Sequence, residues 1–260
     1  MLVKRSEVAA VGESRAIIYL ATCDSQIDTA EAAEALFSAL EQVGFGLDRY
    51  NDREPVNIPF SRETATQMWT LGTTYNEPGY TCTGNIFLGR HSKPGIDLTV
   101  CWNTSSDIGC LSSINISLSK KQLIKSMKSC MQLFRTLIQT FHPAYAYIGT
   151  KGAHWRQCGQ LWMGIPGIYW LNYFGKEYVD FLGSDYILNC DWDHTEWFAD
   201  GIFAWTAPSI ALPEEDVIAN EQKYREHLGI QYFIPRGYNS EAAPPIFMEM
   251  RERINQRKRS

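Results

Sequence analysis

The stretch at residues 164–183 constrains the fold most, because a tight turn, an apolar strand and a short helix follow one another within it. A Pro-Gly pair opens it with a turn signal, since proline fixes φ and glycine tolerates a positive φ. Residues 168–173 then carry side chains that favour strands, and both faces of such a strand are mostly apolar. We therefore expect a central strand covered on both sides. Gly175, followed by apolar residues at helical spacing, predicts a short helix that ends at Gly183.

Strand and helix patterns alternate through the rest of the chain, which predicts an α+β fold. Further strands are expected at residues 14–22, 85–88, 96–102, 113–118, 145–148 and 201–205. Shorter segments at 67–73, 186–188 and 231–234 also predict strands. Helices are expected after a cap at Asp28 or Thr29, after Pro213, and in the segment 242–259.

The longest expected helix runs from Lys120 to Phe141. Ser119 and Gln122 have the spacing of a capping box, and Pro143 stops the helix. Its apolar residues keep a spacing of three to four along one face, which predicts that the helix packs on a sheet. These residues are Leu123, Ile124, Met127, Met131, Phe134, Leu137, Ile138 and Phe141.

A chain of 260 residues can bury one large core, and no low-complexity linker divides it. We therefore expect a single domain over residues 1–260, with its core at about 15–235. Its architecture is expected to be a mostly antiparallel, twisted sheet with the long amphipathic helix packed on it. Residues 236–260 form a C-terminal extension that ends in a basic tail.

The charge is −5 overall but unevenly spread. Without the last ten residues, 19 basic residues face 28 acidic ones, a net charge of −9. An acidic body disfavours nucleic acid as a ligand, because neutralising phosphates needs a basic surface. It is compatible with a basic protein partner, although many acidic proteins have none.

The compartment expected from the sequence is the cytoplasm. Seven cysteines are scattered without a Cys-x-x-Cys pair, which favours reduced, mostly buried thiols over a disulfide framework or a zinc site. The N-terminal segment lacks the long apolar core of a signal peptide, and no apolar run is long enough to cross a membrane. Neither a membrane nor a cofactor is therefore expected as a partner.

The run Asp-Trp-Asp-His-Thr-Glu at residues 191–196 is the densest group of chemically active side chains. Its carboxylates and imidazole are types that bind metals or act as general acid and base; the residues in question are Asp191, Asp193, His194 and Glu196. A solvent-facing acidic loop is the simpler explanation of the run, and the one we favour. A third interpretation is an acidic patch for a basic partner, with Trp192 and Trp197 as aromatic anchors.

The segment Tyr-Trp-Leu-Asn-Tyr-Phe-Gly-Lys-Glu-Tyr-Val-Asp-Phe-Leu-Gly at 169–183 resembles the segment typical of the immunity protein 52 family of bacterial immunity proteins. The order of elements also looks like that family: Leu-Thr-Val-Cys-Trp-Asn at 98–103, then a long amphipathic helix, a proline and a short Tyr-rich strand. The resemblance extends over residues 15–235. It implies a cytoplasmic antitoxin that neutralises a toxin, often nuclease-like, from a polymorphic-toxin or type VI secretion system.

The sequence and the resemblance together predict a non-enzymatic immunity protein that binds a cognate toxin directly. The predicted contact residues are Asp191, Trp192, Asp193, Glu196 and Trp197. One alternative is a metal-dependent hydrolase centred on residues 191–196, and another is an adaptor without a toxin partner.

Overall fold

The computed structural model describes residues 15–22, 27–71, 75–77, 80–82, 84–103, 112–153 and 165–233. An α+β domain is built on one ten-stranded sheet in which every pair of neighbours is antiparallel. The predicted fold class is thereby confirmed. The strands, in their order across the sheet, are β11 (His194–Phe198), β12 (Gly201–Trp205), β10 (Leu171–Phe174), β9 (Tyr145–Thr150), β1 (Arg15–Thr22), β8 (Ser112–Ser119), β7 (Ile96–Asn103), β6 (Gly84–His91), β2 (Arg49–Asn51) and β3 (Ile58–Pro59). A separate hairpin consists of β4 (Tyr75–Glu77) and β5 (Tyr80–Cys82).

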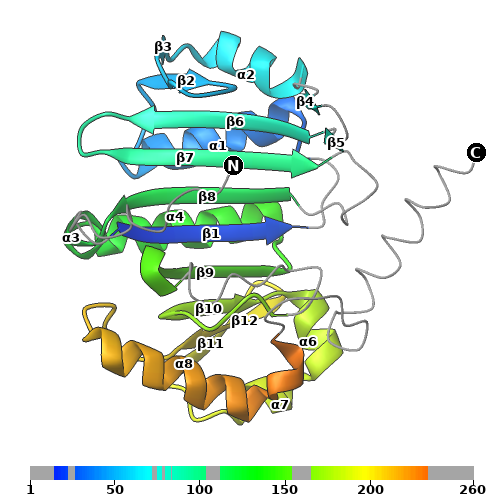
Figure 1. Ribbon diagram of the computed structural model, residues 1–260, viewed down its shortest axis with the longest axis vertical. Coiled ribbons are helices and arrows are strands. Elements are labelled where there is room, and N and C mark those ends of the chain that lie inside the picture. The colour runs from blue at the N-terminus through cyan, green and yellow to red at the C-terminus, as the bar shows by residue number, and fades with distance from the viewer. Residues whose placement is uncertain are drawn as a thin grey trace, which may run out of the picture.

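Four helices cover one face of the sheet: α1 (Ala30–Gln42), α2 (Arg62–Leu71), α3 (Lys120–Lys125) and α4 (Met127–Phe141). In Figure 1, α1 and α4 lie behind the central strands. Thr29 caps α1 as expected, since its hydroxyl accepts a hydrogen bond from the Ala32 N–H. Residues 67–71, expected in a strand, belong instead to α2. Ala65 and Trp69, four residues apart, put one face of that helix into the core.

The long helix is interrupted at Ser126 rather than continuous. Ser119 caps α3 by accepting from the Gln122 N–H, but the Gln122 amide donates to the Ser126 hydroxyl instead of closing the capping box. At Ser126 φ is −110° and ψ is 28°, which are not helical values, and this residue separates α3 from α4. Ile124, expected on the buried stripe, is 46% exposed, whereas Cys130 and Leu133 of α4 are buried.

The opposite face of the sheet is covered at its β9–β12 end by α6 (Lys176–Leu182), α7 (Ser184–Leu188), α8 (Glu214–Leu228) and the short 3-10 helix η2 (Ile230–Tyr232). Figure 1 shows α8 in front of this end. Two predicted strands fall here and are wrong: residues 186–188 lie in α7, and residues 231–232 lie in η2. Ile187, Leu188 and Tyr232 pack on the sheet as part of a second layer instead of extending it. The helix expected at 242–259 lies outside the described residues.

Residues 171–182 form the expected buried strand and short helix, but β10 begins at Leu171, three residues later than expected. The cause is Asn172, which is fully buried. Its amide oxygen accepts from the Tyr169 N–H and the Tyr145 hydroxyl, and its amide nitrogen donates to the Tyr169 and Ala204 carbonyls. The side chain thus holds the preceding residues in a turn. At Gly175 a Cβ would lie 2.1 Å from the Pro143 carbonyl oxygen, so the chain can only pass there as glycine.

Candidate functional site

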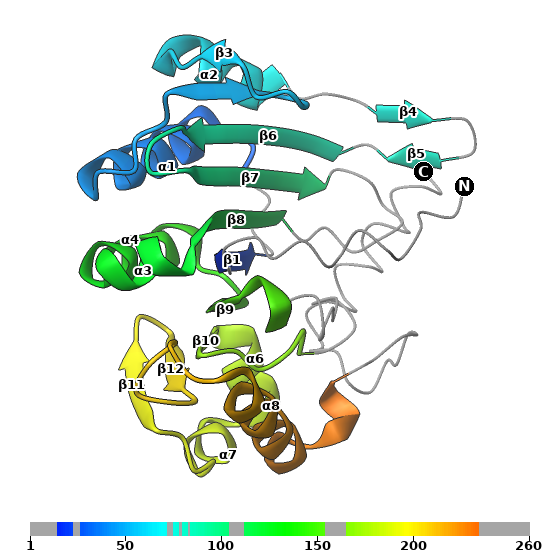
Figure 2. The same cartoon turned by 60° about the vertical axis from the view of Figure 1, so that its left-hand side comes forward.

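The predicted contact residues lie where the chain leaves α7 and enters β11, the strand at one edge of the sheet. In Figure 2 the β11–β12 hairpin lies at the outer side of the molecule, beside α8. The structure places the five residues in four environments. Each environment has a different physical role.

Trp192 belongs to the core. Its side chain is 9% exposed, its ring stacks on Tyr224 of α8 at 4.2 Å between centroids, and its indole N–H donates to the Ile187 carbonyl at 2.8 Å. A ring enclosed in this way stabilises the α7–β11 connection. Trp192 is therefore a packed residue rather than an exposed aromatic anchor.

Asp191 is tied to α8. Its carboxylate lies 2.8 Å from the Lys223 ammonium, and its carbonyl accepts a hydrogen bond from the Tyr224 hydroxyl. The hydrogen bond from Lys223 lowers the pKa of Asp191. Because the Asp191 carboxylate is largely exposed, the pair is screened and contributes little to stability.

Glu196 faces the other side of the sheet, where it holds the hairpin to α4. Arg135 of α4 donates to both carboxylate oxygens, at 3.0 and 2.6 Å, and this lowers the pKa of Glu196. The same guanidinium lies 4.7 Å from the Phe198 ring centre and 5.1 Å from that of Phe203. Glu196 is thereby a structural tether of β11.

Asp193 and Trp197 lie at the surface, as the Asp191 carboxylate also does. Trp197 is 54% exposed, and Asp193 is exposed at the start of β11. Trp197 pairs across the hairpin with Ile202, whereas Glu196 pairs with Phe203. Residues opposite one another in an antiparallel pair point to the same face, so Trp197 lies on the α7–α8 side of the sheet. Neither helix covers it.

An open groove of about 460 Å³, which Asp193 helps to line, lies between the 191–193 segment, the 206–212 loop and α8. Three carboxylates line it: Asp191, Asp193 and Asp216. The cation in its lining is Lys223, which is engaged by Asp191. The groove is therefore acidic. Sequence reasoning missed the part of α8 in it, because an aspartate such as Asp216 in the first turn of a helix is already explained as a partner of the helix dipole.

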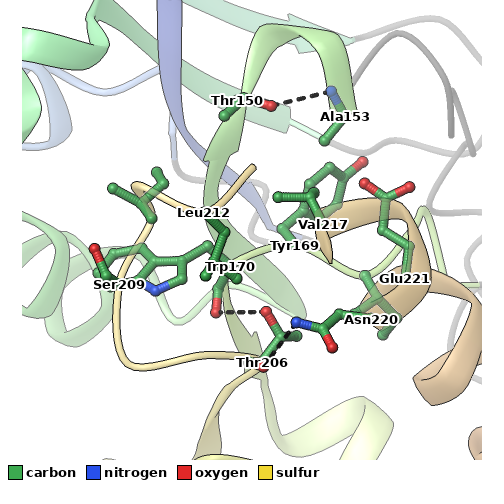
Figure 3. A pocket seen from close by; sticks show the side chains of 12 residues that line it. Thr150, Ala153, Tyr169, Trp170, Thr206, Ser209, Leu212, Val217, Asn220 and Glu221 are labelled. Atoms are coloured by element: carbon green, nitrogen blue, oxygen red, sulfur yellow. Dashed lines mark hydrogen bonds between the residues drawn. The ribbon is translucent and has the colours of Figure 1, made fainter. Parts of the chain in front are cut away.

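A second cavity adjoins the groove and shares Thr206, Leu212 and Asn220 with its lining (Figure 3). Figure 3 shows side chains around it from the end of β9, the turn before β10, and α8, among them Thr150, Tyr169 and Glu221. Its volume is about 20 Å³. That is room for about one water molecule, so this cavity does not hold a substrate.

In the described ranges, the side chains that the metal-site alternative requires do not come together as a set of ligands. Asp191 points to Lys223, Glu196 to Arg135 across the sheet, and the His194 ring lies 5.0 Å from that of Trp205. Across the part of the chain that the structure describes, no group of three or more His, Cys, Asp or Glu side chains could hold a metal ion.

Cys101, Cys130 and Cys190 carry thiols rather than disulfides, and burial raises the pKa of Cys130 and of Cys190 to about 12. Thiols with so high a pKa stay protonated at neutral pH and are poor nucleophiles. Within the same described ranges no helix has both the length and the apolar character needed to span a bilayer.

Comparison with known proteins finds a likeness in structure but none in sequence. No family model matches the chain, and no curated protein matches it. A solved structure described as "Pseudomonas aeruginosa T6SS protein PA0821" superposes with a TM-score of 0.56 at 14% sequence identity. The match covers 93% of this chain and 83% of the other. At this identity the likeness shows a shared fold: the chain has the architecture of a protein named for the type VI secretion system (T6SS).

Proposed function

We propose that this chain is an immunity protein that neutralises a toxin of a type VI secretion system by direct contact. The observation that carries the proposal is the shared fold with a T6SS protein over nearly the whole chain. The segment at 169–183, which resembles the immunity protein 52 family, supports it independently. In this proposal the protein acts by binding in the cytoplasm and needs neither a cofactor nor a metal.

The binding surface in this proposal consists of Trp197, Asp193 and the acidic groove beside α8, which we call the acidic edge. Exposed tryptophan is typical of interface anchors, and carboxylates attract a basic toxin. The net charge of −9 outside the tail also speeds association by steering a basic partner toward the protein. The association rate should therefore fall as salt is raised.

The test is co-expression with the toxin encoded by the neighbouring gene. We expect cells to survive, and the purified pair, with the toxin inactivated, to bind with a submicromolar Kd. Dead cells together with no binding in that range contradict the proposal. Binding without protection of the cells would favour an adaptor.

A matched pair of variants locates the surface. Trp197→Ala removes an exposed ring at the acidic edge and is expected to weaken binding at least about 10-fold. Leu71→Ala removes a side chain that is 83% exposed at the end of α2, near the opposite end of the sheet, and should leave binding unchanged. Equal effects of the two variants would place the contact elsewhere.

A further inference from the structure

The two edge strands of the sheet differ in how well they are protected against pairing with a further strand. The β3 edge consists of two residues and contains Pro59, features that discourage another strand from pairing. The β11 edge has five residues and contains neither proline nor lysine. In the described ranges no strand pairs with β11 other than β12. The β11 edge is thus open to main-chain pairing.

The register of the hairpin identifies which main-chain groups point outward. A two-residue turn joins Phe198 to Gly201, so this pair exchanges hydrogen bonds, as do the alternate pairs at Glu196 and His194. The main-chain groups of Thr195 and Trp197 therefore point away from β12. They form the donors and acceptors that an added strand would meet.

The strand is also held in place before any partner arrives. The bidentate bond from Arg135 to Glu196 fixes its centre, and stacking of Trp192 on Tyr224 fixes the segment that leads into it. A pre-organised strand loses little conformational entropy on binding, which favours affinity.

The charges near β11 indicate which kind of strand can pair with its open edge. Carboxylates lie at both ends of β11: Asp193 precedes it, and Asp200, which accepts a hydrogen bond from the Tyr173 hydroxyl and stays 44% exposed, lies in the turn that follows. A second copy paired antiparallel on β11 would bring the Asp193 of one chain toward the Asp200 of the other, and like charges would repel. An extended segment with Lys or Arg at these positions would instead be attracted by both ends.

We propose that β11 is the docking strand of this protein: an extended, basic segment of the toxin adds to the sheet beside Thr195 and Trp197, with the Trp197 ring packed against it. This inference rests on the proposed function and assigns its mode of binding. Main-chain hydrogen bonds supply affinity, while Asp193 and Asp200 supply selectivity for basic side chains.

Two substitutions of one residue separate main-chain pairing from side-chain contact. Thr195→Pro removes the outward N–H and puts a ring where the added strand would lie, yet proline is tolerated at an outward position of an edge strand. We expect it to weaken binding of the inactivated toxin about 100-fold. Thr195→Ala removes the hydroxyl and keeps the N–H, so its Kd should stay within about 3-fold of the original. Circular dichroism checks that both variants are folded.

Amide hydrogen exchange on the unsubstituted protein also tests whether the toxin pairs with the main chain of β11. It remains decisive if the Thr195→Pro variant does not fold. The amides of Thr195 and Trp197 should exchange rapidly in the free protein and become protected in the toxin complex. If the unchanged chain binds but these amides stay unprotected, or if Thr195→Pro binds normally, β11 is not the docking strand and the immunity function stands. If the unchanged chain does not bind the toxin at all, both proposals fail. A free protein that is dimeric, with both amides already protected, would overturn the proposal by showing that a second copy occupies the edge.

Discussion

Replacing Asn172 by alanine should destabilise the fold more than its small size suggests. The amide makes four hydrogen bonds in a site that no solvent reaches. Deleting it leaves the Tyr169 N–H, the Tyr169 carbonyl and the Ala204 carbonyl without this partner. A buried polar group that loses its partner costs about 1–3 kcal/mol, and partial rearrangement recovers some of that. The expected loss in the free energy of unfolding is about 3–5 kcal/mol.

Urea unfolding followed by circular dichroism measures this loss, with the m-value as a check on two-state behaviour. Asn220→Ala is the matched control, because this half-buried amide donates a hydrogen bond to the Thr206 carbonyl at 3.3 Å. Its loss should stay below about 1 kcal/mol. If Asn172→Ala is no more destabilising than Asn220→Ala, the turn before β10 does not depend on the buried amide, and Asn172 is not the cause of the late start of the strand.

Further expectations concern the β11–β12 hairpin and the ring beside it. Ala199 has φ of 52°, so Ala199→Gly should relieve backbone strain and raise the free energy of unfolding by about 0.5–1 kcal/mol in a urea titration. A double-mutant cycle of Arg135→Ala and Glu196→Gln should give a coupling energy of about 1 kcal/mol at neutral pH. Because the folded pKa of Glu196 is lowered, this coupling should persist above the ordinary glutamate pKa of about 4.3 and disappear as pH falls through the folded value; coupling unchanged at low pH would contradict the assignment. Trp170 is only partly buried and donates to the Ala207 carbonyl at 3.0 Å, so Trp170→Ala should cost about 2–3 kcal/mol, less than a fully buried aromatic, as measured by thermal unfolding.

The sequence correctly predicts the strands and helices in which apolar residues repeat at the period of that element. Alternation in β7 and β8 and the stripe of α4 are confirmed by burial, because a strand or helix with one buried face must repeat apolar residues at its own period. The predictions that fail are short apolar segments. Residues 186–188 have strand-type side chains, yet they pack as a helix on the sheet, and tertiary packing decided between the two.

The location of the candidate site was predictable from the sequence, but the roles of its individual side chains were not. The acidic run at 191–196 does lie at an exposed edge, but alternation along β11 divides its side chains between two faces. Partners distant in sequence then assign the roles: Arg135 engages Glu196, Lys223 engages Asp191, and Tyr224 covers Trp192. No local pattern contains that information. The contribution of α8 to the groove was missed for the same reason.

The position of β1 has a consequence for how the chain reaches its native state. It is the first strand in sequence, yet it pairs with β8 on one side and β9 on the other, so that Ala16 lies opposite both Leu118 and Thr150. During synthesis this apolar segment therefore has no native strand partner until roughly a hundred further residues have been made. Folding should consequently be slow, as in other folds in which most strand pairs are distant in sequence. Until β8 and β9 have been made, the apolar segment of β1 has neither of its strand partners. A chain that stops before β9 would keep one edge of β1 open, which makes truncated products prone to aggregate.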